Sequence, residues 1–143
     1  MNDKNIINRL TFNPRILFLI DGLGALLTAF FLFVVLDHFN KYIGMPTTIL
    51  NSLSLIAICF CIYSIACFFF LKRHWKPFII GIGIANLLYS ILTIGILITH
   101  FSILTIIGIS YFLVEIVFIC GLVYIEFNIA KAIKQNKLEI SQF

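Results

Sequence analysis

The stretch ILFLIDGLGALLTAFFLFVVL, residues 16–36, holds a single charged side chain, Asp21, in a run that is otherwise apolar or neutral. A helix rises 1.5 Å per residue and needs about 20 such residues to cross about 30 Å of hydrocarbon. The run is longer than the apolar core of a usual signal peptide, and no small-x-small cleavage site follows it before Asp37. The stretch therefore predicts a retained transmembrane helix.

Three further runs have the same length and character, at 49–71, 78–99 and 103–125. Pro14, Pro46 and Pro77 fall at or just before the starts of the first three runs, where the missing N–H costs a helix little. The connections between the runs are short, at 37–48, 72–77 and 100–102. Short connections make consecutive helices antiparallel neighbours. The sequence predicts an all-α fold, a polytopic membrane four-helix bundle with up-down-up-down topology.

Composition points to the same class of protein. Hydrophobic residues make up 62% of the chain and charged residues 11%, whereas a soluble domain is usually about half apolar and about a quarter charged. A soluble fold of this size would expose several apolar faces. The basic residues behind the net charge of +4 lie at the ends of apolar runs. This placement predicts contact with the lipid bilayer and its anionic headgroups, and no nucleic-acid partner.

The distribution of basic residues predicts the orientation. Nine of the ten Lys and Arg residues flank one side of the spans: Lys4, Arg9, Arg15, Lys72, Arg73, Lys76, Lys131, Lys134 and Lys137. The other side has only Lys41. By the positive-inside rule, the side with the nine basic residues is cytoplasmic, and the predicted single domain 1–143 is a multi-pass membrane protein. Its ends, 1–15 and 126–143, are both expected in the cytoplasm.

Two carboxyl groups lie well inside the predicted spans, Asp21 in the first and Glu115 in the fourth. An ionisable side chain costs several kcal/mol in lipid unless it faces protein or water, so each is a candidate for function. At 1.5 Å per residue, Asn86, Tyr89 and Glu115 fall about 12–16 Å above the cytoplasmic end. We therefore expect Glu115 to face the bundle interior beside Asn86 or Tyr89. Asp37 and Glu126, at the ends of spans, are expected at the membrane interface.

Helical spacing adds small and polar companions to these carboxyls. Residues three and four apart share a helix face, and four such stripes occur: Asp21, Gly24, Ala25 and Thr28; Ser54, Ala57, Cys61 and Ser64; Asn86, Tyr89, Ser90 and Thr93; Gly108, Tyr111 and Glu115. Each predicted helix thus has a face suited to the bundle interior. The resulting candidate ligand or ion pocket comprises Glu115, Asp21, Asn86, Tyr89, Tyr111 and Thr28.

Signs of other chemistry are missing from the sequence. The four cysteines lie inside apolar runs without a CxxC pair, so we expect them to be unpaired packing residues. The three histidines lie in predicted connections, too scattered to form a metal site. No HExxH, GxSxG, paired-aspartate protease or P-loop pattern occurs. An enzyme is not expected, and the sequence indicates no catalytic residue, cofactor or metal.

Four stretches carry a resemblance to known proteins: LFLIDGLGALLTAF at 17–30, GMP at 44–46, ANLLYSILT at 85–93 and YFLVE at 111–115. They resemble small bacterial four-helix inner-membrane proteins of the hypothetical-protein type. The chain is also similar to the DoxX-like four-helix proteins in length and helix count, without a matching motif. The resemblance covers most of the chain and implies a bacterial inner membrane, but no activity.

The residues leave two functions open. In the first, the bundle binds or transports a cation, a proton or a small ligand in an acidic intramembrane pocket. In the second, the chain is a structural or accessory subunit whose polar residues only hold helices together, as they commonly do in lipid. Both are compatible with a homo-oligomer or a membrane partner protein. The direction in which Asp21 and Glu115 point distinguishes the two functions.

Overall fold

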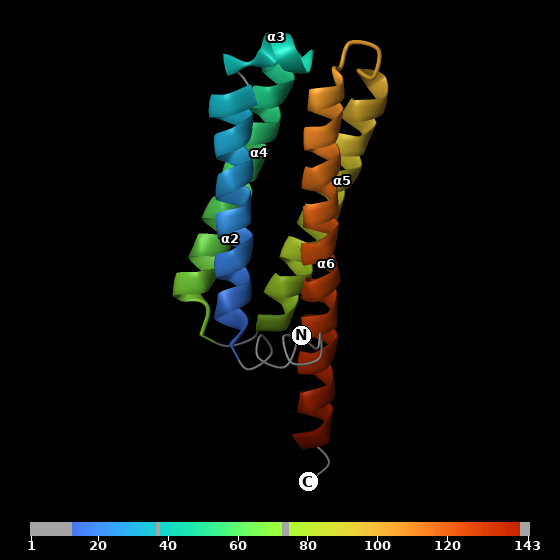
Figure 1. Cartoon of the computed structure of the whole chain (residues 1–143). Helices are drawn as coiled ribbons and strands as arrows, with labels where there is room; N and C mark the ends of the chain where they lie inside the picture. Colours follow the sequence, from blue (N-terminus) through green and yellow to red (C-terminus); the bar gives the residue numbers. More distant parts are fainter. Residues whose placement is uncertain (1–12, 37, 73–74, 141–143) are drawn as a thin grey trace.

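A computed structural model of the chain describes residues 13–36, 38–72 and 75–140. Helices account for nearly all of this part: α2 (Pro14–Phe30), the π-helix η1 (Phe31–Leu36), α3 (Asn40–Ile43), α4 (Thr47–Phe70), α5 (Trp75–Thr99) and α6 (Ile106–Ile140). Figure 1 shows the long helices α2, α4, α5 and α6 lying roughly parallel or antiparallel, with the short α3 across one end. The predicted all-α four-helix bundle is confirmed.

Four segments are long and apolar enough to cross a membrane: Pro14–Val34, Thr47–Phe70, Trp75–Thr99 and Ile106–Ile133. Between 33% and 39% of the most apolar part of each segment is buried. The remaining apolar side chains face outward, which is the distribution expected of helices that lipid surrounds. The chain therefore has the build of a multi-pass membrane protein.

The helix ends differ from the predicted spans most clearly in α6. The predicted span was 103–125, whereas the helix begins at Ile106 and continues to Ile140. The prediction ended where apolar residues become sparse. The polar residues that follow include no proline and no glycine, so nothing in the sequence stops the helix there. Much of the predicted cytoplasmic end 126–143 is thus a continuation of α6.

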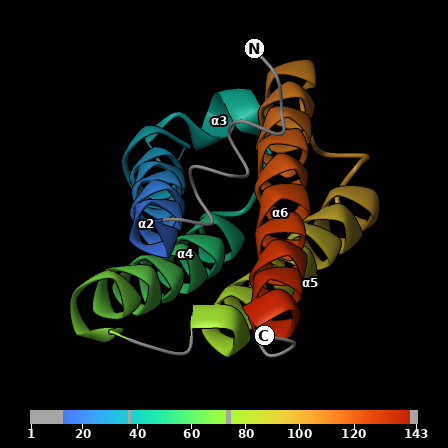
Figure 2. The same cartoon turned by 90° about the horizontal axis from the view of Figure 1, so that it is seen from below.

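The four long helices form two pairs. α2 packs along α4, and α5 packs along α6, while the two pairs approach each other closely at fewer places. Figures 1 and 2 show the α2–α4 pair beside the α5–α6 pair. Consecutive long helices are antiparallel, as predicted. The tightest packing lies within each pair, and α4 and α5, which are consecutive, are not packed along their length.

The α3 end of the bundle is tied together by main-chain contacts. Gly44 has a positive φ of 79°, and a side chain there would collide with the carbonyl of Ile103. The Thr105 N–H donates to the Ile43 carbonyl at 2.9 Å, and the Thr105 hydroxyl donates to the Tyr42 carbonyl. The connection after α2 is thereby attached to the start of α6, and this links the two helix pairs at one end.

Two apolar clusters fill the interior. The first lies toward α3 and includes Leu32, Leu53, Tyr89 and Val123. The second lies at the end where α2 begins, and includes Phe18, Cys67, Ile82 and Ile129. We call this second end the basic end, because Arg15, Lys72 and Lys76 lie there. On every long helix, a buried polar residue lies between the residues of the two clusters, namely Asp21, Ser64, Asn86 and Glu126.

Candidate functional site

These four polar residues meet in a single network between the helices. Asp21 of α2 accepts hydrogen bonds from the Ser64 hydroxyl of α4 and, at 2.7 Å, from the Asn86 amide of α5. The same Asn86 nitrogen donates at 3.3 Å to Glu126 of α6. Each helix supplies one member, so the network joins both helix pairs. It forms a polar layer between the two apolar clusters.

Small residues make room for this layer. Gly83 lies one turn before Asn86, and a Cβ added there would meet the second Glu126 oxygen, Oε2, at 3.2 Å. Gly22 lies next to Asp21, and a Cβ there would meet the Cβ of Ser64 at 3.5 Å. A larger side chain at Gly83 would push the Glu126 carboxyl out of its place. Close helix packing through glycine is a common device in membrane bundles.

Glu126, which was expected at the membrane interface, is buried inside the bundle. Its side chain is 0% exposed, and Asp21 is 2% exposed. The helix continues beyond it, and Ile129 and Ala130 in the next turn are also buried. A signal for this was present in the sequence: Glu115, Ile119, Leu122, Glu126 and Ile129 follow the spacing of one helix face. Asp37, the other residue expected at the interface, lies outside the described residues.

A second polar contact lies nearer the α3 end, within the α5–α6 pair. The Tyr89 hydroxyl donates to Glu115 Oε1 at 3.0 Å, and Glu115 is 7% exposed. The expected proximity of Glu115 to Tyr89 is therefore present. Asn86 bonds to Asp21 and Glu126 and has no bond to Glu115. Asn86 lies one turn before Tyr89 on α5. Because α6 runs antiparallel to α5, Asn86 faces a residue that comes later in α6 than Glu115, namely Glu126.

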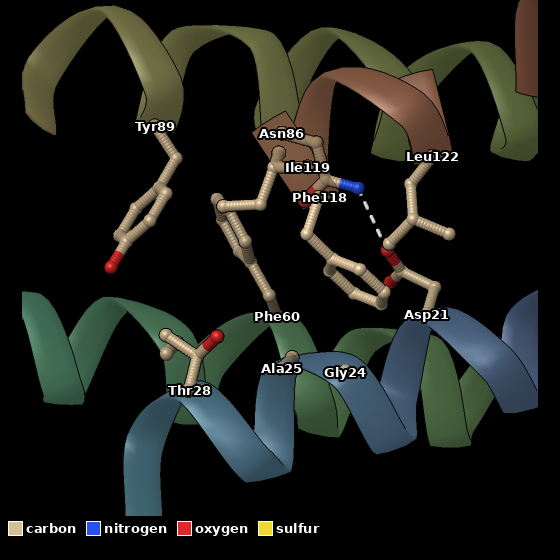
Figure 3. A pocket seen from close by; sticks show the side chains of 11 residues that line it. Asp21, Gly24, Ala25, Thr28, Phe60, Asn86, Tyr89, Phe118, Ile119 and Leu122 are labelled. Atoms are coloured by element: carbon tan, nitrogen blue, oxygen red, sulfur yellow. Dashed lines mark hydrogen bonds between the residues drawn. The ribbon is translucent and has the colours of Figure 1, made fainter. Parts of the chain in front are cut away.

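A small cavity of about 20 Å³ adjoins the network on its α3 side. It lies between the helix pairs and is lined by Asp21, Gly24, Ala25, Thr28, Ala57, Phe60, Asn86, Tyr89, Phe118, Ile119 and Leu122. Figure 3 shows Asp21 and Thr28 of α2 facing Asn86 and Tyr89 of α5 across it. This space can hold about one water molecule. Four of the six predicted pocket residues thus share one cavity.

The remaining two predicted pocket residues lie apart from the cavity. Glu115 reaches it only through its bond to the Tyr89 hydroxyl. Tyr111 is half-buried, and its ring packs against those of Phe31 and Phe112 instead. The stripe Gly108, Tyr111 and Glu115 therefore does not act as one face of the pocket. A close contact of Gly108 with Ile43 holds that part of α6 against α3.

The buried carboxyls lack basic partners in the described part of the chain. Every side-chain hydrogen bond found on Asp21, Glu115 and Glu126 comes from a neutral donor. Arg15 lies over the Trp75 ring, 5.8 Å from its centre, and no Lys or Arg lines the cavity. Glu115 Oε2 and Glu126 Oε2 are buried without a hydrogen-bond partner. Buried polar atoms usually have partners, so these oxygens stand out.

The four cysteines are free thiols, two of them buried and two exposed on outward faces. In the described residues, no group of three His, Cys, Asp or Glu side chains is arranged to hold a metal ion. Comparison with protein-family models, curated proteins and solved structures finds no match for the chain. The four apolar helices are compatible with a small membrane protein, but these comparisons confirm no relation to the DoxX-like proteins.

Proposed function

We propose that this membrane protein binds a cation or a proton at the Asp21–Glu126 network in the interior of its bundle. One observation carries the proposal: two buried carboxyls accept hydrogen bonds from the same Asn86 nitrogen, and no basic side chain of the described residues neutralises either. Intramembrane carboxyls that face one another are typical of proton and ion pathways. Transport across the membrane would be an extension of this binding.

The electrostatics of the pair support the proposal. The bonds of 2.7 Å and 3.3 Å to one nitrogen hold Asp21 Oδ1 and Glu126 Oε1 at most about 6 Å apart, within the range of strong charge coupling. Two negative charges at this distance repel by about 3 kcal/mol at an effective dielectric constant of about 20. Each charge has also lost its hydration. A proton on one carboxyl, or a bound cation, removes the repulsion.

The alternative, a structural or accessory subunit, has its own support. The network takes one residue from each long helix and therefore links the two helix pairs, as a packing device would. A network selected only for packing would be expected to satisfy its polar atoms. Glu115 Oε2 and Glu126 Oε2 both lack a partner, so the second carboxyl beside Asn86, and not the unpartnered oxygen, favours a binding site.

The proposed orientation places the basic end in the cytoplasm of a bacterial cell, with the protein in the inner membrane. Arg15, Lys72 and Lys76 all lie at that end, which is consistent with the positive-inside rule. The Asp21–Glu126 network then lies in the cytoplasmic half of the membrane. A reporter fused after Phe143 should be active in the cytoplasm, and periplasmic activity would overturn this orientation.

Infrared difference spectroscopy on the full chain in lipid nanodiscs tests the proposal. Raising the pH, or adding a cation at constant pH, should remove a carbonyl band of protonated carboxylic acid. Asp21→Asn and Glu126→Gln should each abolish most of this response, because they remove one titratable group and keep the shape of the side chain. Glu115→Gln is the matched control and should leave most of it. If the response is the same in all three variants, the Asp21–Glu126 network is not the binding site.

A further inference from the structure

Three aromatic rings surround the cavity beside Asp21. Phe60 of α4, Tyr89 of α5 and Phe118 of α6 all line it, and Figure 3 shows them between the carboxyl and the α3 end. The rings of Phe60 and Tyr89 lie edge to face, with centres 6.0 Å apart. Aromatic faces attract organic cations, and a carboxylate beside them adds a full negative charge. This is a chemical setting for an alkylammonium group.

The side chains that line this cavity are poorly suited to binding a hard metal ion. Ca²⁺ takes about six to eight oxygen ligands, and Mg²⁺ about six. Of the side chains that line the cavity, only those of Asp21, Thr28, Asn86 and Tyr89 carry a polar atom. The Asn86 side chain already uses its nitrogen on the two carboxyls. The other lining residues are apolar, so a bound metal ion would lack most of its coordination shell.

The cavity also borders the lipid-facing surface. It lies between α2 and α6, and its outer wall includes Phe118, which is 55% exposed. Gly24 faces this ring closely, since a Cβ there would lie 3.3 Å from Phe118 Cε1. The enclosed part, about 20 Å³, is too small for an organic cation, so binding requires Phe118 to move. Outward rotation of Phe118 would join the enclosed part to the lipid.

We infer that the pocket binds a lipophilic organic cation, such as a quaternary ammonium compound, which enters sideways from the lipid between α2 and α6. The charged head lies beside Asp21 and the rings of Phe60, Tyr89 and Phe118, and the apolar body stays in the seam. The inference rests on the proposed function, because it needs the Asp21–Glu126 network to be a cation site. It adds the class of ligand and its route of entry.

Binding of benzyltrimethylammonium to the full chain in nanodiscs tests the inference, measured by equilibrium dialysis. Neopentylbenzene, in which carbon replaces the charged nitrogen, is the neutral control of the same shape. The ammonium compound should bind and the hydrocarbon should not compete with it. Asp21→Asn should abolish binding. Equal binding of both compounds would show only an apolar crevice and would overturn the inference.

Variants of Phe118 test the aromatic contact and the route. Phe118→Leu should weaken ammonium binding by about 5- to 30-fold, the range expected for one cation–π contact. Phe118→Tyr keeps the ring and should lose much less binding than Phe118→Leu. The matched control is Phe69→Leu on the outer face of α4, where the ring is 67% exposed and lies outside the cavity lining; it should have no effect. An equal loss in Phe118→Leu and Phe69→Leu would contradict the aromatic contact.

The infrared experiment separates the two proposals. A carboxyl response to pH that depends on Asp21 and Glu126, without any binding of benzyltrimethylammonium, would mean that the site takes protons or small ions and that the inference is wrong. Absence of both the carboxyl response and ammonium binding would overturn the proposed function as well. Binding that survives in Asp21→Asn would place the ammonium site elsewhere.

Discussion

The Asp21–Glu126 network and the Tyr89–Glu115 contact use similar side chains for different chemistry. The first places two carboxyls on one amide nitrogen and connects all four long helices. The second places one carboxyl on one hydroxyl, within the α5–α6 pair. A single carboxyl with one donor can stay protonated and act as a packing residue. Two carboxyls held beside one amide group create a place for a positive charge, so the proximity of a second carboxyl distinguishes the two regions.

The two regions also differ in where they lie relative to the cavity. The network borders the cavity between the helix pairs, where a ligand has space. The Glu115 carboxyl lies inside one pair, and the Tyr89 hydroxyl stands between it and the cavity. Glu115, which the sequence alone presented as the leading candidate, thus lies outside the network, whereas Glu126, which it presented as interfacial, belongs to it.

The largest expected effect is on cation binding. Glu126→Gln should weaken benzyltrimethylammonium binding by about 30-fold or more, because it removes a buried negative charge that lies next to Asp21 across the Asn86 amide, whereas Glu115→Gln should change it little. Binding should also strengthen as the pH rises, by up to about tenfold per pH unit if one proton leaves for each cation bound. Protons and the cation compete for the same carboxyls, which sets this sign. Equal losses in the two variants would remove the distinction between the regions.

The next effect is on stability. Asn86→Leu should lower the free energy of unfolding by about 2–4 kcal/mol, because it leaves Glu126 without a donor and Asp21 with Ser64 alone. Thermal unfolding in detergent measures the loss. The control is Asn51→Leu on an exposed face of α4, where the change should stay within about 0.5 kcal/mol. Similar losses in both variants would mean that the shared amide contributes no special stability.

A smaller effect is expected in the Tyr89–Glu115 contact. Tyr89→Phe removes the hydroxyl donor to Glu115 and should cost about 1 kcal/mol of stability. The ring remains in the cavity wall, so ammonium binding should stay within about twofold of its original strength. Equilibrium dialysis measures ammonium binding and thermal unfolding measures stability, both on the same preparation of the variant. A loss of binding comparable to that of Glu126→Gln would show that the two regions act as one site.

The smallest expected effect is a difference in stability between two serine variants, one that loses a hydrogen bond to a carboxyl group and one that loses a hydrogen bond to a main-chain carbonyl. Ser64→Ala removes a donor to Asp21, and Ser54→Ala removes a bond of 3.3 Å to the Ala29 carbonyl. Both serines are buried on α4 and contact α2. Ser64→Ala should cost about 0.5–1.5 kcal/mol and exceed Ser54→Ala, because a bond to an ionised group is stronger. The reverse order would indicate that Asp21 is uncharged in the folded protein.

The amino-acid sequence determined the class of fold and the inward faces of the helices. The lengths of the apolar runs predicted four long helices, and three- and four-residue spacing placed Asp21, Asn86 and Tyr89 on inward faces. These are properties of a single helix, namely its rise and its period, and can be read from one sequence. Depth along the helices placed Glu115 beside Asn86 or Tyr89, and the contact is with Tyr89.

Only the tertiary structure decided which inward faces meet. The burial of Glu126 depends on the continuation of α6 beyond its apolar run. The hydrogen bonds of Asn86 to Asp21 and Glu126 depend on the relative rotation and offset of the helices. The pairing of α2 with α4 and of α5 with α6, and the aromatic cavity left between the pairs, arise in the same way. Rotation and offset are set by how side chains of two helices interlock, and the periodicity of each helix by itself carries no information about them.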